Sequence, residues 1–352
     1  MILRLKTAII KICYRLVWIC LKGLTKSPKI EIIYQNRRQE EGKLVEDVVY
    51  RCNEPAYIDP DYGYIITEKG FLIEESMQSN FINNKSALRI GVPSPFKFLK
   101  YRKSFDKATA PFQFHSVISL RHLWEWNYYH FYFDALSKLE LLEFVGVDTR
   151  QPIALGRYVD DVNFARTVLG SGDFANYEWL APKDEYILGE SVIYCRTNRP
   201  YRNRVRFICN SMKIDSDAPP EKHRIFLNRV GNRRLINIDE LNPIFEKYQF
   251  KTIDAAEMSV QEQIDAFKNT RYLIANHGAG TTNIIYRGEH PLSVLELHSD
   301  KCVNYDHKRI CDELDHFWDQ LKGKANNDLW NVADYSISPV ELEKKIIRLL
   351  EN

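Results

Sequence analysis

Glycine and proline are scarce, with 15 and 14 residues in a chain of 352, and no repeat period or low-complexity tract is present. Collagen-like and disordered chains are therefore excluded. The seven cysteines form no CxxC pair and no ligand spacing with histidine. Scattered single thiols exclude a small disulfide scaffold and predict buried side chains in a reducing, intracellular compartment. The length predicts two globular domains.

Positive charge is concentrated at the N-terminus. The net charge is +2, but the first 30 residues hold seven of the 49 basic residues and no acidic one. The remaining 42 basic residues face 47 acidic ones, so the rest of the chain is acidic. An acidic body argues against a nucleic-acid partner, because such binding depends on neutralising phosphates.

Residues 1–30 also lack an uninterrupted run of about 20 apolar residues and a small-residue cleavage site, which disfavours a membrane span and a signal peptide. Six of the basic residues fall within a stripe of about 60° on a helix, and the rest of the surface is mostly apolar. We therefore expect an amphipathic helix on an anionic membrane surface. The alternative is a helix packed against the body of the protein or a partner.

Alternating strands and helices dominate the chain beyond residue 115. Predicted strands at 224–229, 271–276 and 291–298 are separated by predicted helices of about ten to fifteen residues, a pattern typical of parallel βαβ units. Two of these helices and a third near the C-terminus begin with capping-box spacing, at Asn237, Ser259 and Ser338. Ligands bind such α/β sheets at the carboxyl ends of the strands.

A polar segment with a proline pair, 213–223, predicts a domain boundary. We expect domains at 31–215 and 216–335, followed by a C-terminal helix at 336–352.

The strongest local signal for a binding site is a turn between a strand and a helix. Its small residues would let a diphosphate approach the backbone, and the first amides of the helix suit an anion. The predicted contacts are Asn276, His277, Gly278, Ala279, Gly280, Thr281 and Asn283. An ordinary tight turn is the alternative.

Three arginines follow the first strand of the same predicted domain. Arg229, Arg233 and Arg234 would reach the same ligand from the carboxyl end of that strand, and guanidinium groups bind phosphate through paired hydrogen bonds. A solvated basic loop is the alternative. A further cluster between Arg196 and Arg206 indicates a surface stripe more than an anion site.

A second constellation carries acid–base chemistry. Asn127, His130 and Asp134 have i, i+3 and i+7 spacing and share one helical face. A carboxylate beside an imidazole suits removal of a proton from a hydroxyl group. A buried structural pair on an aromatic helix is the alternative. Two Asp-x-Asp pairs, at Asp59 and at Asp215, fit surface turns better than a magnesium site.

These motifs, in this order, resemble glycosyltransferase family 61. The resemblance runs from His115 to His298 and rests on Trp126–His130 with Asp134, on Ile225–Arg229 with Arg233 and Arg234, and on Glu262–Ile264 followed by the His277 turn and Glu296. It implies a GT-B architecture of two Rossmann-like domains facing a central cleft. The N-terminal domain would serve the acceptor and the C-terminal domain the nucleotide sugar. It also implies an inverting reaction that needs no metal or other cofactor.

The expected function is transfer of a hexosyl or pentosyl group from a nucleotide-diphosphate sugar, UDP-linked, to a glycan or lipid-linked glycan. The residues expected to act are Asp134, His130 and Asn127 in catalysis, with Glu296 as an acceptor from the ribose hydroxyls. We expect the protein at the inner face of a bacterial cell membrane, in capsular or surface polysaccharide synthesis. A nucleotide-sugar epimerase of the same architecture and a non-catalytic scaffold of polysaccharide assembly are the alternatives.

Overall fold

The computed structural model describes residues 29–40, 43–60, 63–69, 73, 76, 112–156, 159–183, 185–198, 200–214, 223–302, 304–329 and 332–352. The predicted amphipathic helix falls almost wholly outside the described residues. Among the helices that are described, none has the length and apolar character needed to cross a membrane. The chain divides into two compact units, one of Met1–Gly170 and Phe174–Arg199, the other of Ser171–Asp173 and Pro200–Asn352.

The first unit is built on a mixed sheet in the order β1-β2-β8-β5-β6-β7, to which β3 and β4 attach through β8. Strands β5 to β8 run parallel to their neighbours among themselves, whereas β1 to β4 pair antiparallel. The strands are β1 (Ile30–Glu40), β2 (Lys43–Cys52), β3 (Ala56–Ile58), β4 (Ile65–Thr67), β5 (Gln113–Ser119), β6 (Ile153–Ala154), β7 (Trp179–Leu180) and β8 (Ile187–Arg196). Val117 and Val192, at the centre of paired β5 and β8, are fully buried, as expected of parallel strands covered on both faces.

Short helices follow the strands of this unit. They are α3 (Tyr128–His130), η2 (Phe131–Leu136), α4 (Lys138–Phe144), α5 (Asn163–Leu169) and η3 (Gly172–Asn176). The first two residues of η3 are assigned to the second unit and the rest to the first. The first three of these helices stand where the spacing of Asn127, His130 and Asp134 predicts a helix, and η2 among them is a π-helical turn. A π turn widens the helix by one residue and is frequent at functional sites.

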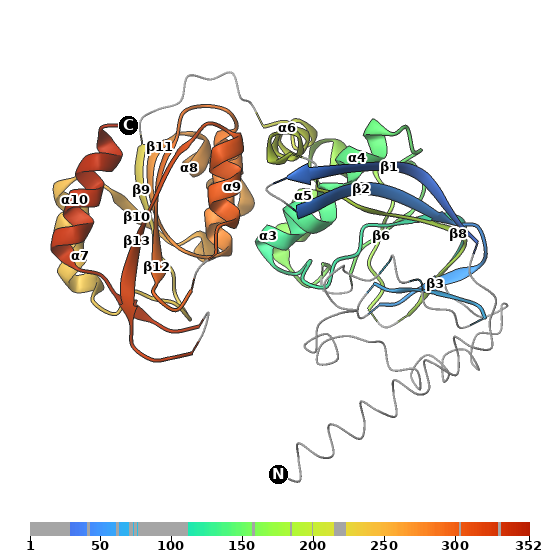
Figure 1. Ribbon diagram of the computed structural model, residues 1–352, viewed down its shortest axis with the longest axis horizontal. Helices are drawn as coiled ribbons and strands as arrows, with labels where there is room; N and C mark the ends of the chain where they lie inside the picture. Colours follow the sequence, from blue (N-terminus) through green and yellow to red (C-terminus); the bar gives the residue numbers. More distant parts are fainter. Residues whose placement is uncertain are drawn as a thin grey trace, which may run out of the picture. The chain divides into compact units, whose positions relative to one another are not determined.

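The second unit is a six-stranded sheet in the order β10-β9-β11-β12-β13-β14, parallel except for β14. The strands are β9 (His223–Leu227), β10 (Lys251–Ile253), β11 (Thr270–Asn276), β12 (Ser293–Ser299), β13 (Phe317–Ala325) and β14 (Tyr335–Ser336). The helices are α6 (Tyr201–Ser211), α7 (Ile238–Lys247), η4 (Ala255–Glu257), α8 (Val260–Lys268), η5 (Ala279–Arg287), α9 (Asp306–Glu313) and α10 (Pro339–Leu350). Figure 1 shows α7 and α10 on one face of this sheet and α8 and α9 on the other.

The core of the second unit explains why α10 belongs to it and does not stand apart as a separate segment. Leu342, Ile346 and Leu349 of α10 are buried in one cluster with Phe226 and Phe245, whose rings stack at 4.0 Å. The i, i+4, i+7 spacing of these α10 residues puts them on the face that meets the sheet.

The division between the units lies ahead of the predicted boundary at 215/216, because the arginine-rich stretch forms α6 and joins the second unit. Cys209 on α6 donates its thiol hydrogen to the carbonyl of Ile285 at 3.4 Å. Arg202 and Arg206 pair with Asp315 and Glu289. Arg202 and Arg206 therefore have acidic partners within the second unit.

Candidate functional site

In the second unit, the turn after β11 lies against the arginine that follows β9. The two strands are neighbours, with Ala275 opposite Leu227. A Cβ atom on Gly278 would lie 1.8 Å from Nη1 of Arg229. The φ angle of Gly278 is 171°, an extended conformation that any residue adopts. The guanidinium group therefore approaches the backbone more closely than it could if a side chain were present at residue 278.

This contact falls where α/β sheets bind ligands. From β9 the chain moves to β10 on one side and then to β11 on the other, so the strand order reverses between β9 and β11. Crevices outside the carboxyl ends of two such strands are the usual ligand sites of open parallel sheets. Within the turn, the amide of Thr281 bonds to the carbonyl of Gly278 at 3.0 Å, so the amides of Ala279 and Gly280 precede the first bond of η5.

Positive charge is concentrated beside the turn. Burial and the like charge of Arg233 lower the pKa of Arg229. An anion placed beside these two guanidinium groups would relieve their repulsion. Arg234 differs, because its main-chain amide and its Nε both bond to Asp334, at 3.0 and 3.1 Å.

Behind the turn lies a buried carboxylate. Glu296 on β12 has no exposed surface, and its Oε1 lies 2.7 Å from Nδ1 of His277 and 2.7 Å from Nδ1 of His307. Its Oε2 accepts a hydrogen bond from Nε1 of Trp318 at 3.1 Å and lies 3.4 Å from Nε2 of His298. Glu296 thus serves as a hub for its neighbours, and its predicted contact with ribose stays a prediction.

The contacts around Glu296 favour a negatively charged carboxylate beside positively charged histidine. Burial opposes ionisation of Glu296, but the charge of His307 and hydrogen bonds from three histidines hold its pKa well below the ordinary value. Burial acts likewise against a charged His277, yet hydrogen bonds to Cys302 and Glu296 raise its pKa to about 9. Burial alone would raise the pKa of the Cys302 thiol, but hydrogen bonds from His277 and His298 outweigh burial and lower this pKa to about 6.

Three other predicted contacts support the turn from inside. Asn276 accepts a hydrogen bond from the Tyr335 hydroxyl at 2.7 Å, and Asn283 donates to Gln263 at 2.7 Å. Thr281 is fully buried. Their side chains face the protein interior, which leaves the backbone of 278–280 and Arg229 as the groups best placed for a ligand.

The first unit holds the second constellation. His130 Nδ1 lies 2.5 Å from Oδ2 of Asp134, and the two side chains retain 28% and 33% of their exposed surface. They are accessible as well as paired, which a catalytic pair requires. Asn127 does not join them, because its Oδ1 accepts the amide of Tyr129 at 3.1 Å and so caps α3.

A third polar residue joins this pair from outside the motif. Nε2 of His122 lies 3.6 Å from Oδ2 of Asp134, and its ring stacks on that of His130 with centroids 5.2 Å apart. Burial lowers the pKa of His122 to about 3, so it is neutral at physiological pH. Its Nδ1 accepts the amide of Trp124 at 3.3 Å, which leaves the proton on Nε2, facing Asp134.

The loop carrying His122 is held by a buried ion pair. Arg121 Nε donates to Glu125 Oε1 at 2.8 Å, and Glu125 Oε2 accepts the amide of His122 at 3.0 Å. Two exposed aromatic side chains, Trp124 and Trp126, lie on the same loop. Their faces suit stacking against a sugar ring.

Two groups of site residues are thus defined, one in each unit. The second sheet has a doubly wound strand order whose switch point lies between β9 and β11. Residues 128–294 match the model of the family Glycosyltransferase 61, so this part of the chain is a glycosyltransferase 61 domain, and the predicted resemblance is confirmed. Membership of this domain in the family implies glycosyltransferase activity, which uses a sugar donor and an acceptor. No curated protein matches the chain.

Proposed function

We propose that the protein is an inverting glycosyltransferase that moves a hexosyl or pentosyl group from a UDP-sugar to a hydroxyl of a glycan or lipid-linked glycan. The family match supports the reaction class. The single observation that carries the donor assignment is the contact between Arg229 and Gly278 at the point where the strand order reverses.

On the donor side, Arg229, Arg233 and the amides of Ala279 and Gly280 hold the diphosphate. Negative charge develops on its β-phosphate as the bond to the anomeric carbon breaks. Guanidinium groups and amide dipoles stabilise that charge without giving up a proton, so the transfer step as proposed uses no metal ion. Glu296 contributes indirectly, because its hydrogen bond to His277 holds the start of the turn in place.

On the acceptor side, His130 and Asp134 remove the proton. The Nδ1 proton of His130 faces Asp134, which leaves Nε2 with the lone pair that accepts a proton from the acceptor hydroxyl. Asp134 stabilises the resulting imidazolium. The oxygen attacks the anomeric carbon from the face opposite the leaving diphosphate, which inverts the configuration.

The donor assignment is tested by calorimetric titration of the full chain with UDP. Arg229→Lys keeps the charge but loses the paired hydrogen bonds, so we expect affinity to fall about 10-fold or more. Arg234→Lys is the matched control, because Arg234 already bonds to Asp334, and its affinity should stay within about 2-fold of the wild type. Equal affinities for all three proteins would contradict the assignment.

The catalytic pair is tested by single-turnover transfer. Asp134→Asn and His130→Ala should each lower the rate by about 10²–10⁴-fold, while UDP affinity is unchanged. His115→Ala, an exposed histidine on β5 paired with Glu190, should keep full activity. Wild-type rates in Asp134→Asn and His130→Ala would remove the pair from the mechanism.

The alternatives have their own signatures. An epimerase converts the donor sugar with no acceptor present, so incubation with UDP-sugar alone distinguishes it. A scaffold would bind no nucleotide diphosphate at all.

We further propose that residues 1–30 attach the enzyme to the cytoplasmic face of a bacterial membrane, where it contributes to capsular or surface polysaccharide. Their excess of basic over acidic residues supports this proposal. The full chain should sediment with vesicles containing anionic lipid, and a chain lacking residues 1–30 should not. Equal sedimentation of the two proteins would refute it.

A further inference from the structure

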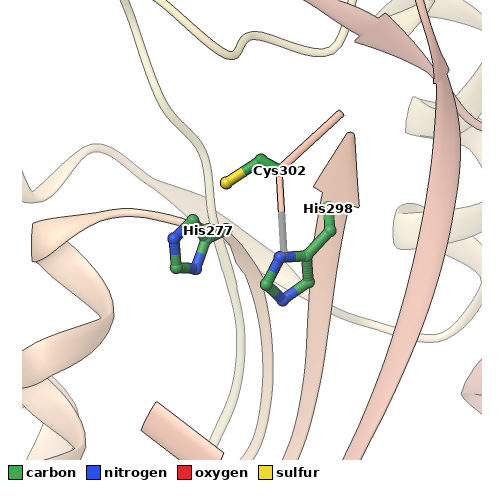
Figure 2. Close-up of side chains that lie close together, drawn as sticks. All are labelled: His277, His298 and Cys302. Atoms are coloured by element: carbon green, nitrogen blue, oxygen red, sulfur yellow. The ribbon is translucent and has the colours of Figure 1, made fainter. Parts of the chain in front are cut away.

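Two histidines and a cysteine gather at the carboxyl ends of β11 and β12. His277 follows β11, His298 lies in β12 and Cys302 lies in the loop beyond it. One ring nitrogen of each histidine and the sulfur all lie within 4.8 Å of one another, and all three residues are more than nine-tenths buried. Figure 2 shows the Cys302 sulfur directed toward the space beside the two rings.

We propose that His277, His298 and Cys302 form a binding site for a zinc ion. Two imidazoles and a thiolate are the donors that zinc prefers, whereas magnesium and manganese prefer carboxylate and carbonyl oxygens. Three protein ligands leave a fourth tetrahedral position for water or another ligand.

The surroundings of the cluster match those of a zinc site. Metal-bound histidines almost always pass their second ring nitrogen to a carboxylate, a carbonyl or water. Glu296 Oε1 is hydrogen-bonded to Nδ1 of His277 at 2.7 Å, so Nε2 of that ring is available to bind the metal. Its Oε2 lies 3.4 Å from Nε2 of His298, which leaves Nδ1 of the second ring. One buried carboxylate therefore orients both imidazoles.

Binding requires a small rearrangement. The two rings stack, with centroids 4.5 Å apart and planes at 23°. Tetrahedral zinc with bonds of about 2.0–2.3 Å sets its ligand atoms about 3.3–3.8 Å apart. At least one ring therefore turns out of the stack, and the donor atoms approach one another by up to about 1.5 Å.

The zinc site is separate from the transfer step. His298 and Cys302 lie beyond the residues that match the family model, and no diphosphate contact is assigned to them. The ion would join the turn after β11, which carries Gly278, to the loop after β12. Its expected role is to fix the position of that turn.

Cobalt(II) substitution of the full chain tests the proposal. With no nucleotide present, one cobalt ion per chain should produce a thiolate-to-cobalt charge-transfer band and the intense visible bands of a tetrahedral ion, and zinc should displace both. Because no donor or acceptor is involved, the result does not depend on whether the protein is a glycosyltransferase.

Variants assign the ligands. Cys302→Ser should abolish the charge-transfer band, and His298→Gln should weaken zinc binding at least as much as the roughly 10–100-fold typical of lost metal-supporting groups. Cys209→Ser, a buried thiol of the same unit outside the cluster, should bind like the wild type, and circular dichroism confirms that each variant is folded. Absence of cobalt binding by the wild type, or a charge-transfer band that survives in folded Cys302→Ser, would overturn the proposal.

Discussion

At the scale of single residues, the close approach of the Arg229 guanidinium group to Gly278 brings positive charge against the backbone of the turn after β11. The small residues of this turn could be predicted from the sequence, but the contact with Arg229 could not. Glu296 is expected near the end of a strand, but it lies in the middle of β12. His298, two residues further along the same strand, shares its face of the sheet. The contact of Glu296 with His307 could not be predicted, because His307 lies on α9, whose packing against β12 the linear pattern does not encode.

Gly278→Ala tests the contact with Arg229. The added methyl group would lie 1.8 Å from Nη1, so the guanidinium must move away from the turn while the extended backbone stays unstrained. We expect UDP affinity to fall about 10-fold, the worth of one charged hydrogen bond, as measured by calorimetry.

Gly280→Ala is the matched control for that prediction. Its new Cβ would meet Leu227 at 3.4 Å, an ordinary van der Waals distance, and its amide is retained. Its affinity should stay close to that of the wild type. Equal losses in the two variants would show that displacement of Arg229 is not the cause.

At the scale of elements, the three helices predicted to begin with a capping box differ in the hydrogen bonds that cap them. The capping box at Ser259 is confirmed, with Ser259 and Glu262 bonded in both directions. At Ser338 the hydroxyl accepts the amide of Glu341, but the Glu341 carboxylate pairs with Lys344. At Asn237 the predicted box is wrong, because the side chain binds the main chain of Ile337 through both its polar atoms.

These caps predict an order of stability. Ser259→Ala removes the two hydrogen bonds of the hydroxyl, one from the amide of Glu262 and one to its carboxylate, and should cost about 1–2 kcal/mol. Ser338→Ala removes one long bond of 3.4 Å and should cost about 0.5–1 kcal/mol. Urea unfolding followed by far-ultraviolet circular dichroism measures both. A larger loss for Ser338→Ala would contradict the assigned difference between the caps.

At the scale of the whole molecule, the sequence predicts the second unit more fully than the first. From residue 223 onward, apolar residues recur with the periods of alternating strands and helices. Strands β9, β11 and β12 lie within two residues of their predicted positions. The first unit mixes antiparallel and parallel strands with a π turn, and its pairings join segments far apart in sequence. Sequence reasoning misses His122 for this reason, since it reaches Asp134 only through the loop held by Arg121 and Glu125.

Buried neutral histidines make both units sensitive to acid. In the second unit, burial, and next the charges of Arg287 and Arg202, lower the pKa of His316 to about 4, while Asp315 opposes the shift. The unfolded chain has a histidine pKa of about 6.5, so it binds the proton more readily than the folded chain does. The stability contributed by neutral His316 is therefore complete above about pH 6.5 and is lost as the pH falls toward 4, by about 3 kcal/mol in all. Between pH 6.5 and 4, the melting temperature of His316→Gln should fall less than that of the wild type. The control is His223→Gln, which replaces an exposed histidine at the start of β9, and its melting temperature should follow the wild-type curve. Parallel curves for His316→Gln and the wild type would show that protonation of His316 is not coupled to unfolding.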